Sequence, residues 1–205
     1  MIKKVFLIGL VIVMAVGVVA IGRYPRHRKS IASSNVPDGN KPLALAEIRA
    51  DIIIPAVNAP AAPEFVEGTW INSDALTLNQ LRGQVVLVEF WTFGCYNCRN
   101  TLPAVKDLDT RYREHGLTIV GVHTPETESE YVLDNVRREV SSLGIKYPVV
   151  TDNDYKAWKA YNVEAWPTIY VIDKQGRIRW LHVGEGRYEE TESVIRALLA
   201  EYVQK

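Results

Sequence analysis

The only two cysteines of the chain, Cys95 and Cys98, lie three positions apart, directly after the apolar run at 85–91. A buried strand that leads through a turn into a helix beginning with Cys-x-x-Cys is typical of a thiol–disulfide exchange site. Unpaired N–H groups and the helix dipole favour an anion at the start of a helix, so Cys95 is predicted to attack as a thiolate. Cys98, one helical turn further on, can then resolve the mixed disulfide.

Two other uses of a close cysteine pair are disfavoured by the sequence. A tetrahedral zinc site needs two further ligands, and the four histidines form no second paired motif with ligand spacing. These histidines are His27, His115, His123 and His182. A permanent structural disulfide would close a loop of only a few residues, and short loops gain least from cross-linking. We therefore predict a redox dithiol with no metal and no other cofactor.

The N-terminal region carries the pattern of a membrane anchor. Lys3 and Lys4 precede an apolar run at 5–22, and basic residues follow at once. A run of this length is at the threshold for a membrane span, and its end is a weak cleavage site, so an uncleaved transmembrane anchor is predicted over 1–29. The distribution of basic residues on the two sides of the run does not favour export. The Pro- and Ala-rich stretch at 30–61 is interpreted as a linker.

Beyond the linker, apolar periodicity predicts one α/β domain over 62–205. The chain of 205 residues suits one domain plus an appendage, and its formal net charge of zero gives no basis for binding nucleic acid. Strands and helices alternate before a hairpin and a final helix. Strands are predicted at 84–91, 118–123, 147–150, 168–173 and 177–183, and helices at 97–115, 128–143, 154–161 and 189–204. Thr127-x-x-Glu130 resembles a capping box at the start of the second helix.

The residues around the cysteines resemble the thioredoxin family. Glu89-Phe90-Trp91 precedes Cys95-x-x-Cys98, Pro103 follows within the helix, and Trp166-Pro167-Thr168 resembles the cis-proline loop of that family. Further segments resemble its extracytoplasmic TlpA-like branch, particularly the thioredoxin domain of DipZ-type proteins. They are 123–126, 147–149, 152–154 and 184–186. The resemblance covers 62–204 and implies a three-layer fold with a mixed central sheet, in which the helix 128–143 is an insertion.

The resemblance also implies a cellular setting. Proteins of this branch work outside the cytoplasm, in the periplasm or at the cell exterior, where a membrane electron donor of the DipZ or CcdA type keeps them reduced. Their substrates are oxidised proteins, including apocytochrome c during cytochrome c biogenesis. The chain departs from thioredoxin in two respects: the residues between the cysteines are Tyr96-Asn97, and the buried acid is Glu89 where thioredoxin has aspartate.

Several other residues are candidates for the site. Glu89 is a charged side chain inside an apolar strand, and we predict that it accepts a proton from Cys98 during resolution. The resemblance implies that Pro167 is cis and that Trp166 shapes a substrate groove, although core packing would also explain this tryptophan. Trp91 belongs either to the active-site surface or to the core, and we favour surface packing beside the thiols. Tyr96 and Asn97 lie between the two cysteines. His123, at the end of a strand, is interpreted as structural.

The sequence thus predicts a membrane-anchored, extracytoplasmic thiol–disulfide oxidoreductase that reduces protein disulfides. The direction of electron flow stays open, because nothing in Tyr96-Asn97 sets the reduction potential, and a disulfide oxidant is an alternative. A thiol peroxidase is a second alternative, since peroxiredoxins share the fold. A thiol-based metal carrier is a remote one, as copper carriers need further soft ligands and the chain has only Met1 and Met14.

Overall fold

The computed structural model describes residues 53–201, and all of these lie within one compact unit. The predicted anchor at 1–29 and the predicted linker up to residue 52 lie outside the described residues. Among the helices within 53–201, none has the length and apolar character needed to cross a membrane.

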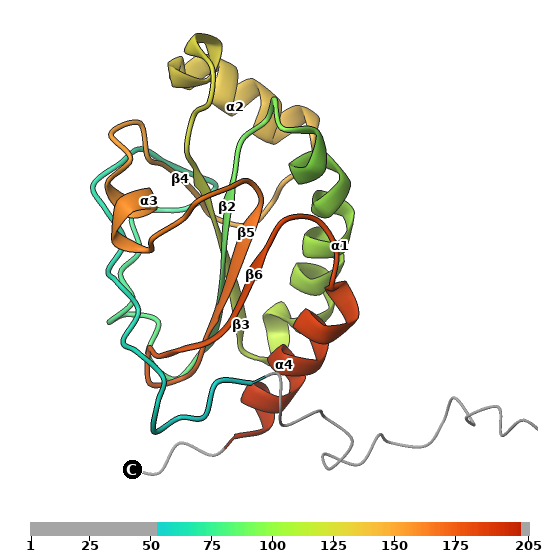
Figure 1. Cartoon of the computed structure of the whole chain (residues 1–205). Helices are drawn as coiled ribbons and strands as arrows, with labels where there is room; N and C mark the ends of the chain where they lie inside the picture. The colour runs from blue at the N-terminus through green and yellow to red at the C-terminus, as the bar shows by residue number, and fades with distance from the viewer. Residues whose placement is uncertain (1–52, 202–205) are drawn as a thin grey trace, which may run out of the picture. The chain divides into compact units, whose positions relative to one another are not determined.

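A mixed sheet of six strands forms the centre of the molecule, in the order β1-β4-β3-β2-β5-β6 (Figure 1). Strands β2, β3 and β4 are parallel, whereas β1, β5 and β6 run antiparallel to their neighbours. The strands are β1 (Trp70–Ile71), β2 (Val85–Trp91), β3 (Leu117–His123), β4 (Val149–Thr151), β5 (Thr168–Ile172) and β6 (Ile178–Val183). The helices are α1 (Tyr96–Tyr112), α2 (Leu133–Ser142), α3 (Lys156–Ala160) and α4 (Tyr188–Ala200), with short 3-10 helices at Arg113–His115 and Glu128–Tyr131.

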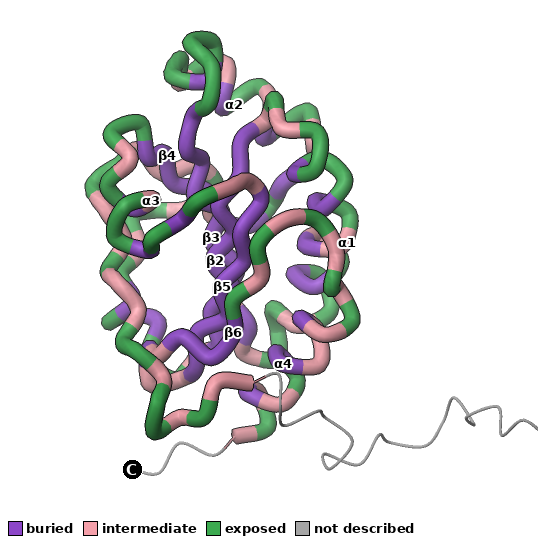
Figure 2. The backbone as a smooth tube through the Cα atoms, in the orientation of Figure 1, coloured by how far each residue is buried: buried purple, intermediate pink, exposed green. Residues whose placement is uncertain are grey.

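Helices cover both faces of this sheet. The side chains of α1, α2 and α4 pack in one core cluster against one face, and α3 packs against the other together with residues from 54–81. All seven residues of β2 are buried, as expected for a central parallel strand covered on both faces (Figure 2). The three-layer α/β architecture with a mixed sheet confirms the fold predicted for the domain, whereas the transmembrane anchor predicted to precede it stays a prediction.

The inserted segment differs in detail from the single helix predicted over 128–143. Thr127 and Glu130 do form a capping box, but it caps the 3-10 helix Glu128–Tyr131. Val132 is extended, with φ −80° and ψ 110°, and α2 begins after it. The two-residue strand β1 was not predicted, because so short a segment carries no periodic signal.

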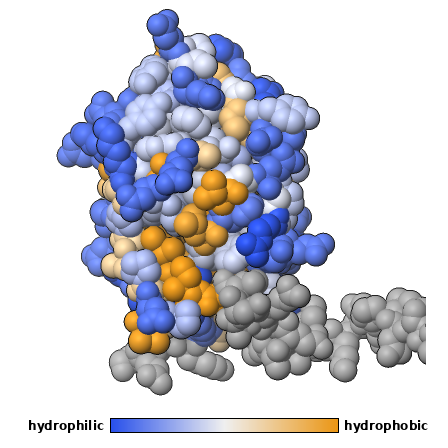
Figure 3. All heavy atoms as spheres, viewed as in Figure 1, coloured by the Kyte–Doolittle hydropathy of each residue, from blue (hydrophilic) through white to orange (hydrophobic). Residues whose placement is uncertain are grey.

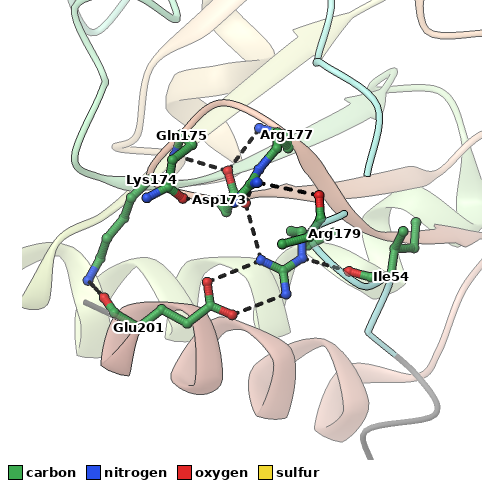
Figure 4. Close-up of polar contacts among 8 residues, drawn as sticks. Ile54, Asp173, Lys174, Gln175, Arg177, Arg179 and Glu201 are labelled. Atoms are coloured by element: carbon green, nitrogen blue, oxygen red, sulfur yellow. Dashed lines mark hydrogen bonds and ion pairs between the residues drawn. The ribbon is translucent and has the colours of Figure 1, made fainter. Parts of the chain in front are cut away.

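The first described residues pack on the domain. Ile54 N–H donates to the Arg179 carbonyl at 2.8 Å, and Ile178 N–H donates to the Pro60 carbonyl at 2.8 Å. The Arg179 guanidinium also donates to the Ile54 carbonyl at 2.6 Å and contacts the carboxylates of Asp173 and Glu201 (Figure 4). The last part of the predicted linker therefore runs along the start of β6.

This attachment point lies at the opposite end of the sheet from the cysteines. The strand register pairs Val86 with Ile172 and Ile172 with Ile178, so the start of β6 lies at the same end of the sheet as the start of β2. In Figure 1 the first described residues, in cyan, lie at the lower end of the molecule, whereas β2 ends and α1 begins at the upper end. Seven strand residues span roughly 20 Å, which separates the two ends.

The strand β6 is one edge of the sheet and exposes apolar side chains. Leu181 and Val183 are both about half exposed. Figure 3 shows an apolar strip over this part of the molecule.

Candidate active site

The two cysteines lie at the N-terminal end of α1 and are joined in a disulfide. Cys95 is the N-cap residue, and the Cys98 N–H donates to its Sγ atom at 3.1 Å. Cys98 is fully buried, whereas Cys95 is partly exposed. Of the two sulfur atoms, that of Cys95 is therefore the one accessible to a second protein, as an attacking thiol must be.

Cys95 opens onto a cleft of about 400 Å³. The cleft brings together the active-site turn, the loop after β3 and the loop before β5. Its lining residues are Gly94, Cys95, Tyr96, Asn97, Glu126, Glu164, Ala165 and Trp166. Three of the predicted substrate-contacting residues, Tyr96, Asn97 and Trp166, therefore surround the reactive sulfur.

The loop before β5 lines the cleft together with Cys95. Its Trp166–Pro167 peptide bond is cis, as the resemblance implied. Trp166 is half-buried, with its ring centroid 4.3 Å from that of Trp158, so it both packs and lines the cleft. Pro167 itself is buried and its carbonyl accepts from Gly184 N–H at 2.7 Å.

Glu89 lies in the middle of β2 and is fully buried. It shares a strand face with Leu87 and Trp91, which pack in the same core cluster as Cys98. Burial raises the pKa of Glu89 to about 8, against the effect of a hydrogen bond from the Tyr147 hydroxyl. This carboxyl can therefore hold or release a proton near neutral pH, as a proton acceptor for a buried thiol must.

Trp91 does not lie where we expected. Its side chain is fully buried, and its ring meets that of His123 edge to face at 5.3 Å between centroids. The parity of β2 turns Trp91 inward beside Leu87 and Glu89, so the expectation that it lies at the substrate surface is corrected.

His123 is buried at the end of β3, in keeping with a structural residue. Burial lowers its pKa to about 4, although the negative charge of Glu130 opposes this shift. Its Nε2 atom lies 3.3 Å from Thr92 Oγ1, and its ring stacks on Phe93. A ring that is neutral above pH 4 supports the active-site turn without carrying a charge.

Several residues of the site were not predicted from the sequence. Glu126 and Glu164 place two carboxylates on the cleft, and Tyr147 holds Glu89. Glu130 was recognised only as part of a capping box, yet it also contacts the active-site turn. Within 53–201, no group of three or more His, Cys, Asp and Glu side chains is placed to hold a metal ion.

Comparison with known families places this site among thiol–disulfide proteins. The model of the AhpC/TSA family matches residues 59–181. The chain is similar to the protein DipZ of Mycobacterium tuberculosis, with 41% identity over 133 residues. These residues are 63% of this chain and only 19% of DipZ, so the chain spans about a fifth of that relative.

Two similar proteins of smaller size carry names that describe an activity. The thiol-disulfide oxidoreductase ResA of Bacillus thuringiensis is 30% identical over 137 residues, which are 67% of this chain and 76% of ResA. A solved structure of a thiol-disulfide isomerase from Corynebacterium glutamicum has a TM-score of 0.64 and 27% identity. That match covers 71% of this chain and 99% of the solved one. A solved protein of the thioredoxin-like superfamily matches 71% of this chain with a TM-score of 0.67 and 27% identity, which shows that the fold is thioredoxin-like.

Proposed function

The chain belongs to the AhpC/TSA family and is a thioredoxin-fold thiol–disulfide oxidoreductase, and from this premise we propose that it reduces protein disulfides outside the cytoplasm. The observation that carries the proposal is the asymmetry of the cysteine pair. One sulfur faces a cleft at a helix N-terminus and the other is buried behind it. That arrangement suits exchange with a protein substrate in two ordered steps.

The reaction begins with the reduced dithiol form. The Cys95 thiolate attacks one sulfur of the substrate disulfide, so that a mixed disulfide forms and the other substrate sulfur leaves as a thiolate. Cys98 loses its proton and attacks Cys95 Sγ, which releases the second substrate thiol. The substrate gains two electrons and two protons, and the protein ends in the Cys95–Cys98 disulfide.

The buried carboxyl supplies the proton acceptor for the second step. Cys98 is fully buried and Glu89 lies on the sheet face that packs against the same cluster. An apolar surrounding disfavours an ionised thiol, so loss of the Cys98 proton needs a nearby base. Glu89, with its raised pKa, takes that role.

The cleft provides the substrate-binding surface. Tyr96 and Asn97 are exposed beside Cys95, and Trp166 lines the opposite side. An extended peptide lying between these walls presents its disulfide to Cys95 and pairs with the backbone that precedes Pro167. Oxidised proteins, such as apocytochrome c, are the proposed substrates.

The regenerating reductant is a dithiol on a membrane partner of the DipZ or CcdA type. The similarity to DipZ supports this partner, and the apolar run at 5–22 supports a membrane anchor. The domain faces the periplasm or the cell exterior in this proposal.

A reductase assay with a trapping variant tests the function. The reduced full chain should reduce the interchain disulfides of insulin, and Cys98→Ser should accumulate mixed disulfides with oxidised protein. Cys95→Ser is the matched control and should do neither. Consumption of hydrogen peroxide without any mixed disulfide would instead support a thiol peroxidase.

A further inference from the structure

Glu130 is a buried carboxylate that joins the inserted segment to the active-site turn. It belongs to the 3-10 helix Glu128–Tyr131, whose other acidic residue, Glu128, is exposed, yet only 1% of Glu130 is accessible. Its Oε2 atom accepts from the N–H groups of Glu126 and Thr127 at 2.7 and 2.8 Å. These two bonds satisfy backbone N–H groups at the start of the segment to which Glu130 belongs, and by themselves they would be ordinary helix capping.

The remaining oxygen reaches the turn that carries the reactive cysteine. Glu130 Oε1 accepts from the Gly94 N–H at 2.8 Å, although the two residues are 36 positions apart. Gly94 directly precedes Cys95, and a Cβ atom at this position would lie 2.6 Å from Oε1. The absence of a side chain at Gly94 is therefore what lets the carboxylate approach the backbone of the turn.

The surroundings keep Glu130 ionised. Burial favours the neutral acid, but hydrogen bonds from the Thr92 side chain and from three backbone N–H groups lower the pKa of Glu130. At neutral pH a negatively charged carboxylate is therefore hydrogen-bonded to the backbone of Gly94, the residue that precedes Cys95. Other ionisable groups line the cleft or contact the turn. Glu126 and Glu164 line the cleft, Arg99 donates to the Phe93 carbonyl, and the buried His123 stacks on the Phe93 ring. Glu89 lies further inside, on the sheet face that packs in the core cluster of Cys98.

We propose that Glu130 is a positioning residue that fixes the turn before Cys95 and, through its charge, disfavours the Cys95 thiolate. A less stable thiolate makes the reduced form less stable relative to the disulfide, which shifts the pair toward reducing potentials. The inserted segment is then the element that biases this site toward reduction. This inference deepens the proposed function and rests on it.

The ionisation of Cys95 tests the proposal directly. The reduced full chain is alkylated with iodoacetamide across a pH series, and mass spectrometry of peptides reports modification at Cys95. Glu130→Gln keeps the shape and removes the charge, so its alkylation midpoint should move to lower pH. Below the midpoint the rate should rise about threefold or more, which corresponds to a pKa fall of about half a unit.

The matched control is Glu128→Gln, which removes the same charge from the exposed side of the same 3-10 helix. Its midpoint should equal that of the wild type. A purely structural capping role would lower the melting temperature of Glu130→Gln and leave the midpoint unchanged, and this result would overturn the proposal. An equal shift in Glu128→Gln would overturn it as well.

A second variant keeps the test decisive if Glu130→Gln does not fold. Glu130→Asp retains the charge but withdraws it by one methylene from Gly94 N–H, so the midpoint should fall by a smaller amount. An unchanged midpoint in this variant would contradict the proposal. The alkylation readout needs no substrate, so a failure here is distinct from a failure of the reductase assay.

Discussion

The hydroxyl of Tyr147 donates a hydrogen bond of 3.0 Å to Glu89 Oε2, although the two residues are 58 positions apart in the chain. Both side chains are fully buried. Tyr147 lies just before β4 and Glu89 in the middle of β2, so the bond reaches across β3, and Tyr147 packs in the same core cluster as Cys98. Glu89, which we propose accepts the Cys98 proton, is thus itself held in place by the neutral hydroxyl of Tyr147.

Replacing Tyr147 by Phe should move the pH dependence of disulfide exchange to higher pH. The Tyr147 hydrogen bond lowers the pKa of Glu89, so its loss lets burial raise that pKa further. One hydrogen bond to a charged group corresponds to a shift of about one pH unit. Stopped-flow rates of the resolution step between pH 6 and 10 would show it. A profile identical to wild type would contradict the role of Tyr147.

Glu89→Gln should change how the stability of the oxidised protein depends on pH. The pKa of Glu89 is about 8 in the folded state and 4.5 as the ordinary value, so between these limits only the folded state holds the proton. The free energy of unfolding of the wild type should therefore fall as pH rises from 4.5 to 8. Glu89→Gln lacks this loss. Its free energy of unfolding, relative to that of the wild type, should therefore increase by on the order of a few kcal/mol between pH 4.5 and 8.

Chemical denaturation of both proteins at several pH values measures this difference. The exposed Glu128→Gln is the control and should track the wild type throughout. A constant difference between Glu89→Gln and wild type across the window would show that Glu89 titrates as an ordinary glutamate.

The double variant Glu126→Gln, Glu164→Gln should react faster with glutathione disulfide. The two carboxylates line the cleft beside Cys95, and glutathione disulfide carries net negative charge. Removing this repulsion should raise the exchange rate about two- to fivefold at low salt, with a smaller gain at high salt because screening weakens it. A rate independent of both the substitutions and salt would mean that these carboxylates do not act on an incoming disulfide.

Arg179→Ala should destabilise the domain without changing exchange chemistry. Arg179 is buried and contacts Asp173, Glu201 and the Ile54 carbonyl (Figure 4). Burial opposes the charge of Asp173, but hydrogen bonds from Arg177 and Arg179 lower its pKa, so removing a partner leaves a buried charge. We expect a loss of about 3–5 kcal/mol in the free energy of unfolding.

The exposed pair Arg137–Asp134, at 3.4 Å, provides the comparison for this prediction. Arg137→Ala should cost less than about 1 kcal/mol. Insulin reduction by Arg179→Ala, measured well below its melting temperature, should match the wild type, because the cluster lies at the far end of β2 from the cysteines. Equal destabilisation by both variants would refute the importance of the buried cluster.

Much of the fold was predictable because its strands are strongly apolar and its helices end at clear signals. The run at 85–91 became the fully buried β2, and Gly116 ends the first helical region with φ 97°. The segment 128–143 was harder, since a capping box marks the start of a 3-10 helix as well as of an α-helix. The two-residue β1 exists only because Trp70 and Ile71 pair with β4, which is a tertiary contact.

The site was predictable where residues are adjacent in sequence and less so where the fold brings them together. Cys95, Cys98 and the cis bond before Pro167 agree with expectation. Tyr147 and Glu130 escaped notice as site residues because their partners lie 58 and 36 positions away. Trp91 was misplaced because both faces of β2 are covered by packed side chains, so even the last residue of the strand lies in the core.

The reduction potential of the Cys95–Cys98 pair decides whether the domain acts as a reductase or as an oxidant. The full chain would be equilibrated against dithiothreitol and glutathione buffers, and the oxidised fraction read by thiol labelling. The account predicts a potential at or below that of thioredoxin, about −270 mV, as a reductase with an upstream dithiol donor requires. A potential approaching about −120 mV, that of the oxidant DsbA, would contradict it.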